Sequence, residues 1–340
     1  SNKVVFVSGA GGSIGKELCH QILLLKPKKI ILYEISESSL YLIEQELLEI
    51  NKFNAEIIAI IGSVLDKGRL DNIFNSHSVQ TIYHAAAYKH VPLVESNQSQ
   101  GFLNNTIGTL IMAQAAIASN VEIFVLISTD KAVRPTNVMG ATKRGAELVL
   151  QALSKLPHNT CLTMVRFGNV IESSGSVIPL FKSQIKKGGP VTVTHIDMVR
   201  YFMTITEAVQ LVIQSGAIAN GGDVFVLDMG APIRINDLAV KMIQLSGLTV
   251  RNKENINGDI EIKYTGLRPG EKLYEELLLS GSFSRTQNKL IMRTEEQMIS
   301  WNKLELLLKL IQQASLDSKT EEIYRLLKKL VPEFNSKNIG

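Results

Sequence analysis

An acid and a base stand side by side directly after a short apolar segment near the middle of the chain. Residues 123–127 predict a buried strand, and Ser128, Thr129, Asp130 and Lys131 follow it. A carboxyl group and an amine at one strand end could serve as the acid and the base of linked proton transfers on one substrate. The competing interpretation is a solvated turn in which Asp130 caps a helix.

A second pair of side chains lies eight residues further on, within a predicted helix that spans 138–153. Met139 and Lys143 are four residues apart, which places them on one face of that helix. A lysine can carry charge toward a ligand, whereas a thioether has no proton to exchange. Met139 therefore cannot act as a base. Asp130 could take a hydroxyl proton in its place, while Thr129 is a poor base unaided.

The composition is that of an ordinary globular chain. The 340 residues are 45% apolar and 20% charged with a net charge of +4, which fits one large domain or two closely joined ones. This charge is too small and too evenly mixed to favour nucleic acid as a partner. The apolar runs are strand-length, so the sequence predicts no transmembrane helix and no signal peptide. Cys19 and Cys161 fall in apolar contexts and should be reduced, as expected in the cytoplasm.

Predicted strands and helices alternate along most of the chain, and together they must position these side chains. The predicted strands are 3–8, 29–33, 56–61, 81–85, 123–127, 162–167 and 223–227. The helices between them include 13–25, 38–50, 101–119 and 138–153. This order predicts an α/β fold with a doubly wound parallel sheet that has helices on both faces.

Irregular segments rich in Gly and Pro interrupt this alternation in the second half of the chain. We expect residues 1–169 and 206–229 to form a dinucleotide-binding domain, and 170–205 and 230–340 to form a smaller substrate-binding lobe. Apolar residues at helical spacing over 301–330 predict two packing helices at the end of this lobe.

A glycine-rich turn joins the first strand to the first helix. Gly9, Gly12 and Gly15 would permit a tight turn, close approach of the backbone to a pyrophosphate, and close packing of the helix on the strand. The N–H groups of Ser13 and Ile14 would point at the phosphates from the helix N-terminus. A purely structural glycine turn is the alternative. In this context the motif predicts a Rossmann-type domain.

Glu34 ends the second predicted strand. A carboxylate there accepts hydrogen bonds from ribose hydroxyls and repels a 2′-phosphate, which favours NAD over NADP. Small or apolar residues after the third and fourth strands would contact the adenine and keep the backbone open beside the nicotinamide half: Ser63, Val64, Ala85, Ala86 and Ala87.

Seven further segments complete a pattern, namely 85–92, 104–109, 128–143, 166–170, 173–179, 200–203 and 267–276. With them the chain resembles the extended short-chain dehydrogenases. It resembles more closely the bacterial UDP-N-acetylglucosamine 4,6-dehydratases of surface-polysaccharide and glycan biosynthesis, from Lys3 to about Met292. Short-chain dehydrogenases carry a catalytic Tyr at the position of Met139. A Met there, together with Asp130 and Lys131, marks longer members, which commonly have membrane-spanning segments ahead of the catalytic domain. The chain begins without Met, so we expect it to be the soluble domain of such a protein.

The resemblance implies NAD-dependent 4,6-dehydration of UDP-N-acetylglucosamine or a close nucleotide sugar. The sugar is oxidised at C4, water is eliminated across C5 and C6, and hydride returns to C6. By resemblance Lys131 takes the C5 proton and Asp130 protonates the leaving C6 oxygen. Lys143 and Asn105 would contact the cofactor. A basic Lys131 needs a lowered pKa, which burial near Lys143 or a cationic nicotinamide could provide.

The resemblance also assigns a set of substrate-binding residues: Lys89, His90, Asn169, Ser173, Ser176, Val177, Arg200, Arg268 and Glu271. Arg200 and Arg268 would pair with the diphosphate, and Glu271 would accept from the uridine ribose. His90 could equally be structural.

The chain departs from the family pattern at two positions, and two other functions compete with the dehydratase. Ser63 stands where Asp is usual and Glu172 where a small residue is usual. A nucleotide-sugar 4-epimerase would oxidise C4 but would not need Asp130 and Lys131. A non-catalytic NAD-binding module would explain the missing Tyr. We expect a homo-oligomer and no metal.

Overall fold

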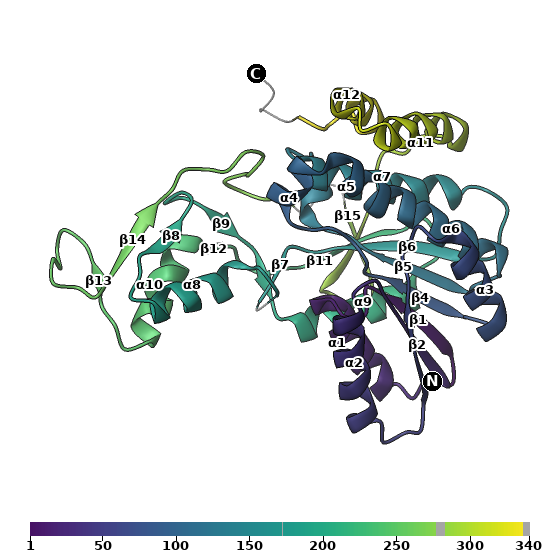
Figure 1. Cartoon of the computed structure of the whole chain (residues 1–340), viewed down its shortest axis with the longest axis horizontal. Helices are drawn as coiled ribbons and strands as arrows, with labels where there is room; N and C mark the ends of the chain where they lie inside the picture. The colour runs from purple at the N-terminus through teal and green to yellow at the C-terminus, as the bar shows by residue number, and fades with distance from the viewer. Residues whose placement is uncertain (172, 277–282, 336–340) are drawn as a thin grey trace.

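The computed structural model describes residues 1–171, 173–276 and 283–335 (Figure 1). Glu172 therefore lies outside the described residues. The main body is a nine-stranded sheet with the order β15-β16-β11-β6-β5-β4-β1-β2-β3. Its strands are β1 Val4–Ser8, β2 Lys29–Glu34, β3 Glu56–Ile61, β4 Thr81–His84, β5 Ile123–Ile127, β6 Cys161–Arg166, β11 Val224–Leu227, β15 Phe283–Arg285 and β16 Ile291–Thr294. The seven strands from β11 to β3 are parallel, as predicted.

Helices cover both faces of this sheet because successive side chains of each strand point to opposite sides. In β1, Phe6 faces one core while Val5 and Val7 face the other. The first core is closed by α3 Lys67–His77, α4 Val91–Ser96, α5 Gln98–Phe102, α6 Gly108–Ala118 and α7 Val138–Leu153. The second is closed by α1 Ser13–Leu24, α2 Glu37–Ile50 and α9 Ile205–Ile218. Figure 1 shows the two layers above and below the sheet.

The helix predicted over 101–119 is interrupted. A turn of π-helix, Leu103–Ile107, separates α5 from α6. Such single π-helical turns within α-helices are rare and occur frequently at functional sites. Here the turn directs Asn105 toward the backbone of Tyr88.

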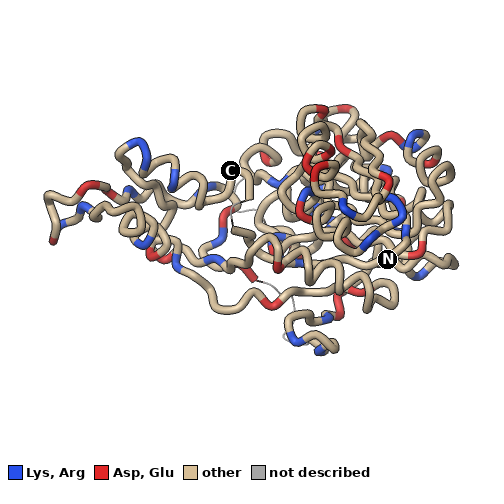
Figure 2. The backbone as a smooth tube through the Cα atoms, turned by 90° about the horizontal axis from the view of Figure 1, so that it is seen from below, with Lys and Arg blue, Asp and Glu red and all other residues tan. Residues whose placement is uncertain are grey.

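A smaller lobe extends from the carboxyl edge of the sheet, on the left in Figures 1 and 2. It contains α8 Val177–Lys186, α10 Ile235–Leu245 and a three-stranded sheet of β8 Val191–Val193, β13 Val250–Arg251 and β14 Ile260–Tyr264. Phe181, Ile243 and Ile260 belong to its separate apolar core. Two short strand pairs lie at its base: β7 Asn169–Val170 with β10 Phe202–Met203, and β9 Val199–Arg200 with β12 Ile233–Arg234.

The lobe is smaller than predicted, because it does not include all of residues 230–340. Strands β15 and β16 join the main sheet, where β16 pairs antiparallel with β11 and buries Ile291. The two predicted terminal helices form as α11 Trp301–Leu316 and α12 Thr320–Leu330, but they pack on the main body. They cover α7, all of whose residues are buried. The edge strand β11 and the apolar surface of α7 both needed partners, and the chain end supplies them.

Opposite charges are interspersed over both parts of the molecule (Figure 2). Among the described residues, every helix is too short or too polar to span a lipid bilayer. Cys19 and Cys161 are both free thiols.

Candidate active site

A cavity of about 870 Å³ lies between the carboxyl edge of the sheet and the lobe. The strand order reverses between β1 and β4, and the turns after these strands line the cavity together with those after β5 and β6. Open α/β sheets bind ligands at such a switch point. A smaller hollow of about 250 Å³ adjoins it beside the end of β2.

The glycine turn forms one wall of the cavity. Gly9 has φ of 67°, and a Cβ atom there would lie 2.7 Å from the backbone N of Ala86. A Cβ on Gly15 would lie 1.9 Å from the carbonyl oxygen of Gly9. Gly12 is the N-cap of α1 and has no side chain to occupy the free N–H groups of the first turn, which Ser13 opens. The donors at this turn therefore fit a pyrophosphate, as predicted for a dinucleotide.

The carboxylate of Glu34 is held at the smaller hollow by three backbone N–H groups. Oε1 accepts from Ile35 at 2.9 Å and Ser36 at 3.1 Å, and Oε2 accepts from Gly11 at 3.1 Å. The predicted neighbours Ser63, Val64, Ala85, Ala86 and Ala87 also line this hollow. An anchored carboxylate in such a position can accept from the hydroxyls of a ribose.

Asn105 does not lie where the sequence analysis put it. Its side chain is buried, accepts from Tyr88 N at 2.8 Å, and donates to Tyr88 O and Thr142 Oγ1 at 3.0 Å each. Asn104 lines the hollow instead. The π-helical turn between α5 and α6 rotates Asn105 into the core, where it fixes the loop that follows β4.

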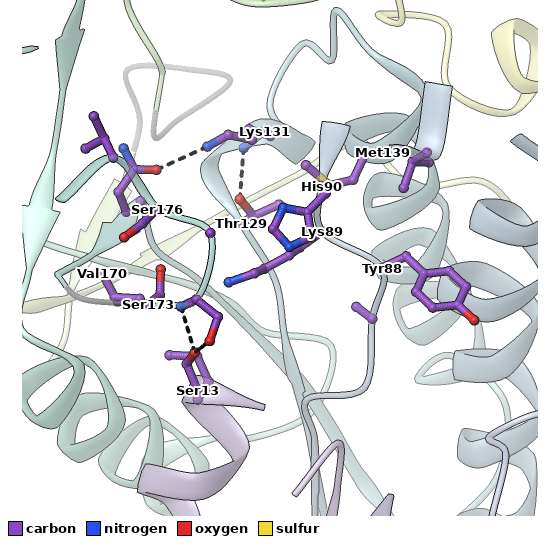
Figure 3. Close-up of a pocket in the computed structure, with 18 of the residues that line it drawn as sticks. Ser13, Tyr88, Lys89, His90, Thr129, Lys131, Met139, Val170, Ser173 and Ser176 are labelled. Atoms are coloured by element: carbon purple, nitrogen blue, oxygen red, sulfur yellow. Dashed lines mark hydrogen bonds between the residues drawn. The ribbon is translucent and has the colours of Figure 1, made fainter. Parts of the chain in front are cut away.

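The acid and base after β5 occupy different depths. Thr129 and Lys131 line the cavity, as Figure 3 shows, whereas Asp130 is only 1% exposed and lies behind them. Oδ1 of Asp130 accepts from Thr129 Oγ1 at 2.8 Å and from Lys131 Nζ at 2.9 Å. Asp130 can therefore exchange a proton with the cavity through Thr129 or Lys131.

The pKa of Lys131 moves opposite to the expectation. Burial alone lowers this pKa, but the nearby carboxylates of Asp130 and Glu275 raise it, and the net shift is upward. Two acids face the ammonium, and their effect on the pKa exceeds the lowering by burial and by the charge of Arg200. Asp130 and Glu275 therefore favour the ammonium form of Lys131.

Met139 and Lys143 share the face of α7 that lines the cavity, as their spacing predicts. Lys143 Nζ donates to the carbonyl oxygen of Ile127 at 2.7 Å. Burial lowers the pKa of Lys143 to about 8, against an opposing effect of Glu147. Met139 is almost fully buried and presents an apolar surface there.

The predicted substrate-binding residues all line the cavity: Lys89, His90, Asn169, Ser173, Ser176, Val177, Arg200, Arg268 and Glu271. Lys131 Nζ reaches Asn169 Oδ1 at 3.5 Å (Figure 3). Burial lowers the pKa of Lys89, and burial together with Lys89 lowers that of His90. Their roles remain predictions.

Glu275 is a charged residue at the site that the sequence analysis missed. It completes a row of alternating charges that runs Asp130, Lys131, Glu275, Arg200, Glu271. Glu275 Oε1 lies 4.0 Å from Lys131 Nζ and 3.7 Å from Arg200 Nη2. The signal in the sequence was a second acid four residues after Glu271.

In the part of the chain that the structure describes, no cluster of three or more metal-ligating side chains could hold a metal ion.

Comparison with known proteins places the chain in one family. Residues 5–296 match the model of a family described as "Polysaccharide biosynthesis protein". The capsular polysaccharide biosynthesis protein CapD of Staphylococcus aureus is 54% identical over 278 residues, which are 82% of this chain and 45% of CapD. The chain thus spans about half the length of this relative. A UDP-glucose 4-epimerase of Rickettsia rickettsii is 32% identical over 84% of this chain and 81% of its own length.

Solved structures share the fold. Pen from Bacillus thuringiensis is 38% identical with a TM-score of 0.73, over 82% of this chain and 84% of Pen. DesIV of Streptomyces venezuelae, a dTDP-glucose 4,6-dehydratase solved with NAD bound, is 19% identical with a TM-score of 0.68, over 81% of this chain and 88% of DesIV. At that identity the likeness to DesIV concerns the fold alone.

Proposed function

The chain belongs to the polysaccharide biosynthesis protein family, and on that basis we propose that it is an NAD-dependent 4,6-dehydratase of a UDP-N-acetylhexosamine such as UDP-N-acetylglucosamine. One observation carries the proposal. Thr129 and Lys131 face the cavity with Asp130 bonded to both, so an acid and a base meet at the point where a sugar would lie between the glycine turn and the lobe.

The cofactor is inferred from the donor set. The turn from Gly9 to Gly15 offers backbone N–H groups to a pyrophosphate, and Glu34 offers a fixed carboxylate to the adenosine ribose. Lys143 would bind the nicotinamide ribose and contribute positive charge. When bound, NAD would supply the oxidation at sugar C4 and the reduction at C6. Because the sugar is first oxidised and then reduced, its net redox state would be unchanged after one turnover. This is consistent with a cofactor that stays bound.

The proton transfers are assigned to three neighbouring side chains. The hydroxyl of Thr129 would accept the proton of the sugar 4-OH while it donates its own to Asp130, to which it is already hydrogen-bonded. Asp130 would later return this proton by the same route to the leaving C6 oxygen. Lys131 would take the C5 proton, which the C4 ketone acidifies. Met139 takes no part because it has no exchangeable proton.

The lobe would bind the nucleotide end of the substrate. Arg200 and Arg268 line the cavity on the lobe side and would pair with the diphosphate. Glu271 would accept from the uridine ribose, and Asn169 would meet the sugar beside Lys131. We retain the division into a dinucleotide-binding domain and this lobe as part of the proposal, together with a homo-oligomeric state that light scattering in solution would test.

A 4-epimerase is the second candidate, since the Rickettsia relative carries that name. An epimerase oxidises C4 but does no chemistry at C5 or C6, so it has no use for the acid–base pair of Asp130 and Lys131. A non-catalytic NAD-binding module would not need that pair either.

One incubation separates the candidates. The protein is mixed with UDP-N-acetylglucosamine, and the nucleotide sugars are examined by mass spectrometry and chromatography. The dehydratase yields a product lighter by one water. An isomer of unchanged mass would indicate an epimerase, and unaltered substrate would contradict both activities. UDP-glucose in a parallel reaction tests the preference for the N-acetyl sugar.

A further inference from the structure

The segment 268–276 of the lobe lies between the proposed catalytic turn and the base of the lobe. On one side Thr136 Oγ1 donates to Gly270 O at 2.7 Å, and Lys272 Nζ donates to Val133 O at 3.1 Å. On the other side Val199 N donates to Leu273 O at 3.1 Å. The segment is therefore bonded to both parts of the molecule, which holds its backbone beside Lys131.

Glu275 is the side chain of this segment that faces Lys131. Its side chain is only 5% exposed, and its Oε1 atom faces both Lys131 Nζ and Arg200 Nη2, at 4.0 and 3.7 Å. Burial of a carboxylate is costly unless it has charged partners, so both cations stabilise its charged form. The charged groups that act on Glu275 are Lys131, Asp130, Arg200 and Lys272.

The proposed chemistry requires Lys131 to lose a proton before it can act as a base. A lysine removes a proton from carbon only as a neutral amine, yet Asp130 and Glu275 favour its ammonium form. Asp130 is already assigned to the proton of the 4-OH. The ammonium therefore needs another acceptor, and Glu275 is the buried carboxylate in position to be one.

We propose that Glu275 is a positioning residue for Lys131, which orients the amine toward the sugar and accepts its proton when substrate binds. The inference rests on the proposed dehydratase function. One N–H bond of the ammonium breaks and one O–H bond forms at Oε1 of Glu275, so an ion pair becomes a neutral amine and a neutral acid. Lys131 takes the C5 proton, returns one of the three equivalent protons of its ammonium group to C5 after hydride delivery, and then recovers a proton from Glu275.

Arg200 would couple this proton transfer to substrate binding. In the structure its guanidinium faces Glu275 and Glu271 and so stabilises the ionised form of Glu275. A diphosphate that pairs with Arg200 would compete for that charge. Burial already raises the pKa of Glu275, against opposing effects of Lys131 and Arg200, so a weaker hold by Arg200 favours its protonated form further. The transfer requires Lys131 Nζ and Glu275 Oε1, which lie 4.0 Å apart, to come within hydrogen-bond distance.

The test compares Glu275→Gln, which keeps the shape and removes the charge, with the wild type. At neutral pH the variant should lose about tenfold to a hundredfold in kcat, with KM for UDP-N-acetylglucosamine changed by less than about threefold. Because solvent base must then remove the Lys131 proton, the ratio of variant to wild-type turnover should rise with pH. Reduced nicotinamide should still appear on mixing with substrate, since oxidation at C4 does not use Glu275.

Matched variants separate this role from a general loss of charge. Glu276→Gln removes the neighbouring acid, which pairs with Arg134 and Lys272, and should keep kcat within about twofold. Glu271 faces the same Arg200 and is proposed to bind the substrate, so Glu271→Gln should raise KM rather than lower kcat. Glu275→Asp retains the charge at shorter reach and should fall between Glu275→Gln and the wild type, with the wild-type pH dependence.

Several outcomes would overturn the inference. A Glu275→Gln protein as fast as the wild type, or faster, would show that Glu275 only keeps Lys131 charged or has no role. A turnover ratio that does not change with pH would exclude proton acceptance. If melting curves show that Glu275→Gln is unfolded, the kinetics of Glu275→Asp test the proposal instead. A change in the KM of Glu275→Asp with an unchanged kcat would then contradict it. A wild type that forms no dehydrated product would refute the proposed function instead.

Discussion

Arg166 and Glu147 form an ion pair with two hydrogen bonds in the interior of the protein, immediately behind the proposed catalytic turn. Arg166 donates from Nε to Oε1 at 2.7 Å and from Nη2 to Oε2 at 2.6 Å, and both side chains are fully buried. Ser128, which precedes Thr129 in the chain, donates to the same carboxylate at 2.6 Å. The pair thus connects α7 and β6 to the turn after β5.

Glu147→Gln should lower the free energy of unfolding by about 3–5 kcal/mol, because it leaves the guanidinium groups of Arg166 and Arg144 buried with less compensating charge. Denaturant unfolding measures the loss. Glu305→Gln, which breaks an exposed pair with Lys309 on α11, serves as the control and should cost under about 1 kcal/mol. Equal losses in the two variants would show that the buried pair contributes nothing special.

The same pair predicts a pH dependence of stability. Burial would raise the pKa of Glu147, but Arg166 and Arg144 hold it down to about 2, below the ordinary 4.5. A group with a lowered folded-state pKa stabilises the protein above its unfolded pKa, and this contribution is lost as the pH falls toward the folded value. The stability of the wild type should therefore drop more steeply between these two values than that of Glu147→Gln.

The protein should purify with NAD rather than NADP. Glu34 is fixed by three backbone donors and would repel a 2′-phosphate. Glu34→Ala should weaken NAD binding by about tenfold or more and reduce the preference over NADP. Chromatography of the nucleotide released on denaturation identifies the cofactor, and titration gives the affinities. Glu37→Ala, in the first turn of α2, is the control. NADP as the main released species would refute the prediction.

Asp130→Asn and Lys131→Ala should each reduce turnover by roughly 10²–10⁴-fold, the range expected for a positioned acid or base, without loss of bound cofactor. In heavy water the wild type should place solvent deuterium at C5 of the product. Asp317→Asn, at the end of α11, should leave turnover unchanged. Absence of label at C5 would contradict the base role of Lys131, or would require that its proton be shielded from solvent throughout turnover.

Met139→Leu should cost under about 1.5 kcal/mol in stability, because it conserves volume at a buried apolar position. Turnover should stay within about tenfold, a change of about 1.4 kcal/mol in the barrier. Met139→Tyr should bring no gain, since the proposed route of the 4-OH proton runs through Thr129 and Asp130. Assays of both variants beside Asp130→Asn decide the matter. Rescue of Asp130→Asn by Met139→Tyr would show that Asp130 serves only the 4-OH, and a different acid would then have to act at C6.

Local patterns in the sequence were sufficient for the parts of the site that depend on one or two adjacent elements. The glycine turn, Glu34 at the end of β2, and the shared face of Met139 and Lys143 follow from the strand and helix periods and from the order of elements along the chain. The parallel sheet follows for the same reason. Each of these features requires only that neighbouring residues adopt the conformation their side chains favour.

Tertiary structure decided what depends on distant segments. Asp130 lies beneath the cavity surface. Burial lowers the pKa of Lys131, but the adjacent Asp130 and then Glu275, which the fold brings in from residues 268–276, raise it further than burial lowers it. The π-helical turn directs Asn105 into the core, and β16 joins the main sheet because β11 had an unpaired edge. The burial and the charge around a side chain depend on every segment that packs against it, so the net shift of the Lys131 pKa could not be predicted from the motif that contains Asp130 and Lys131 alone.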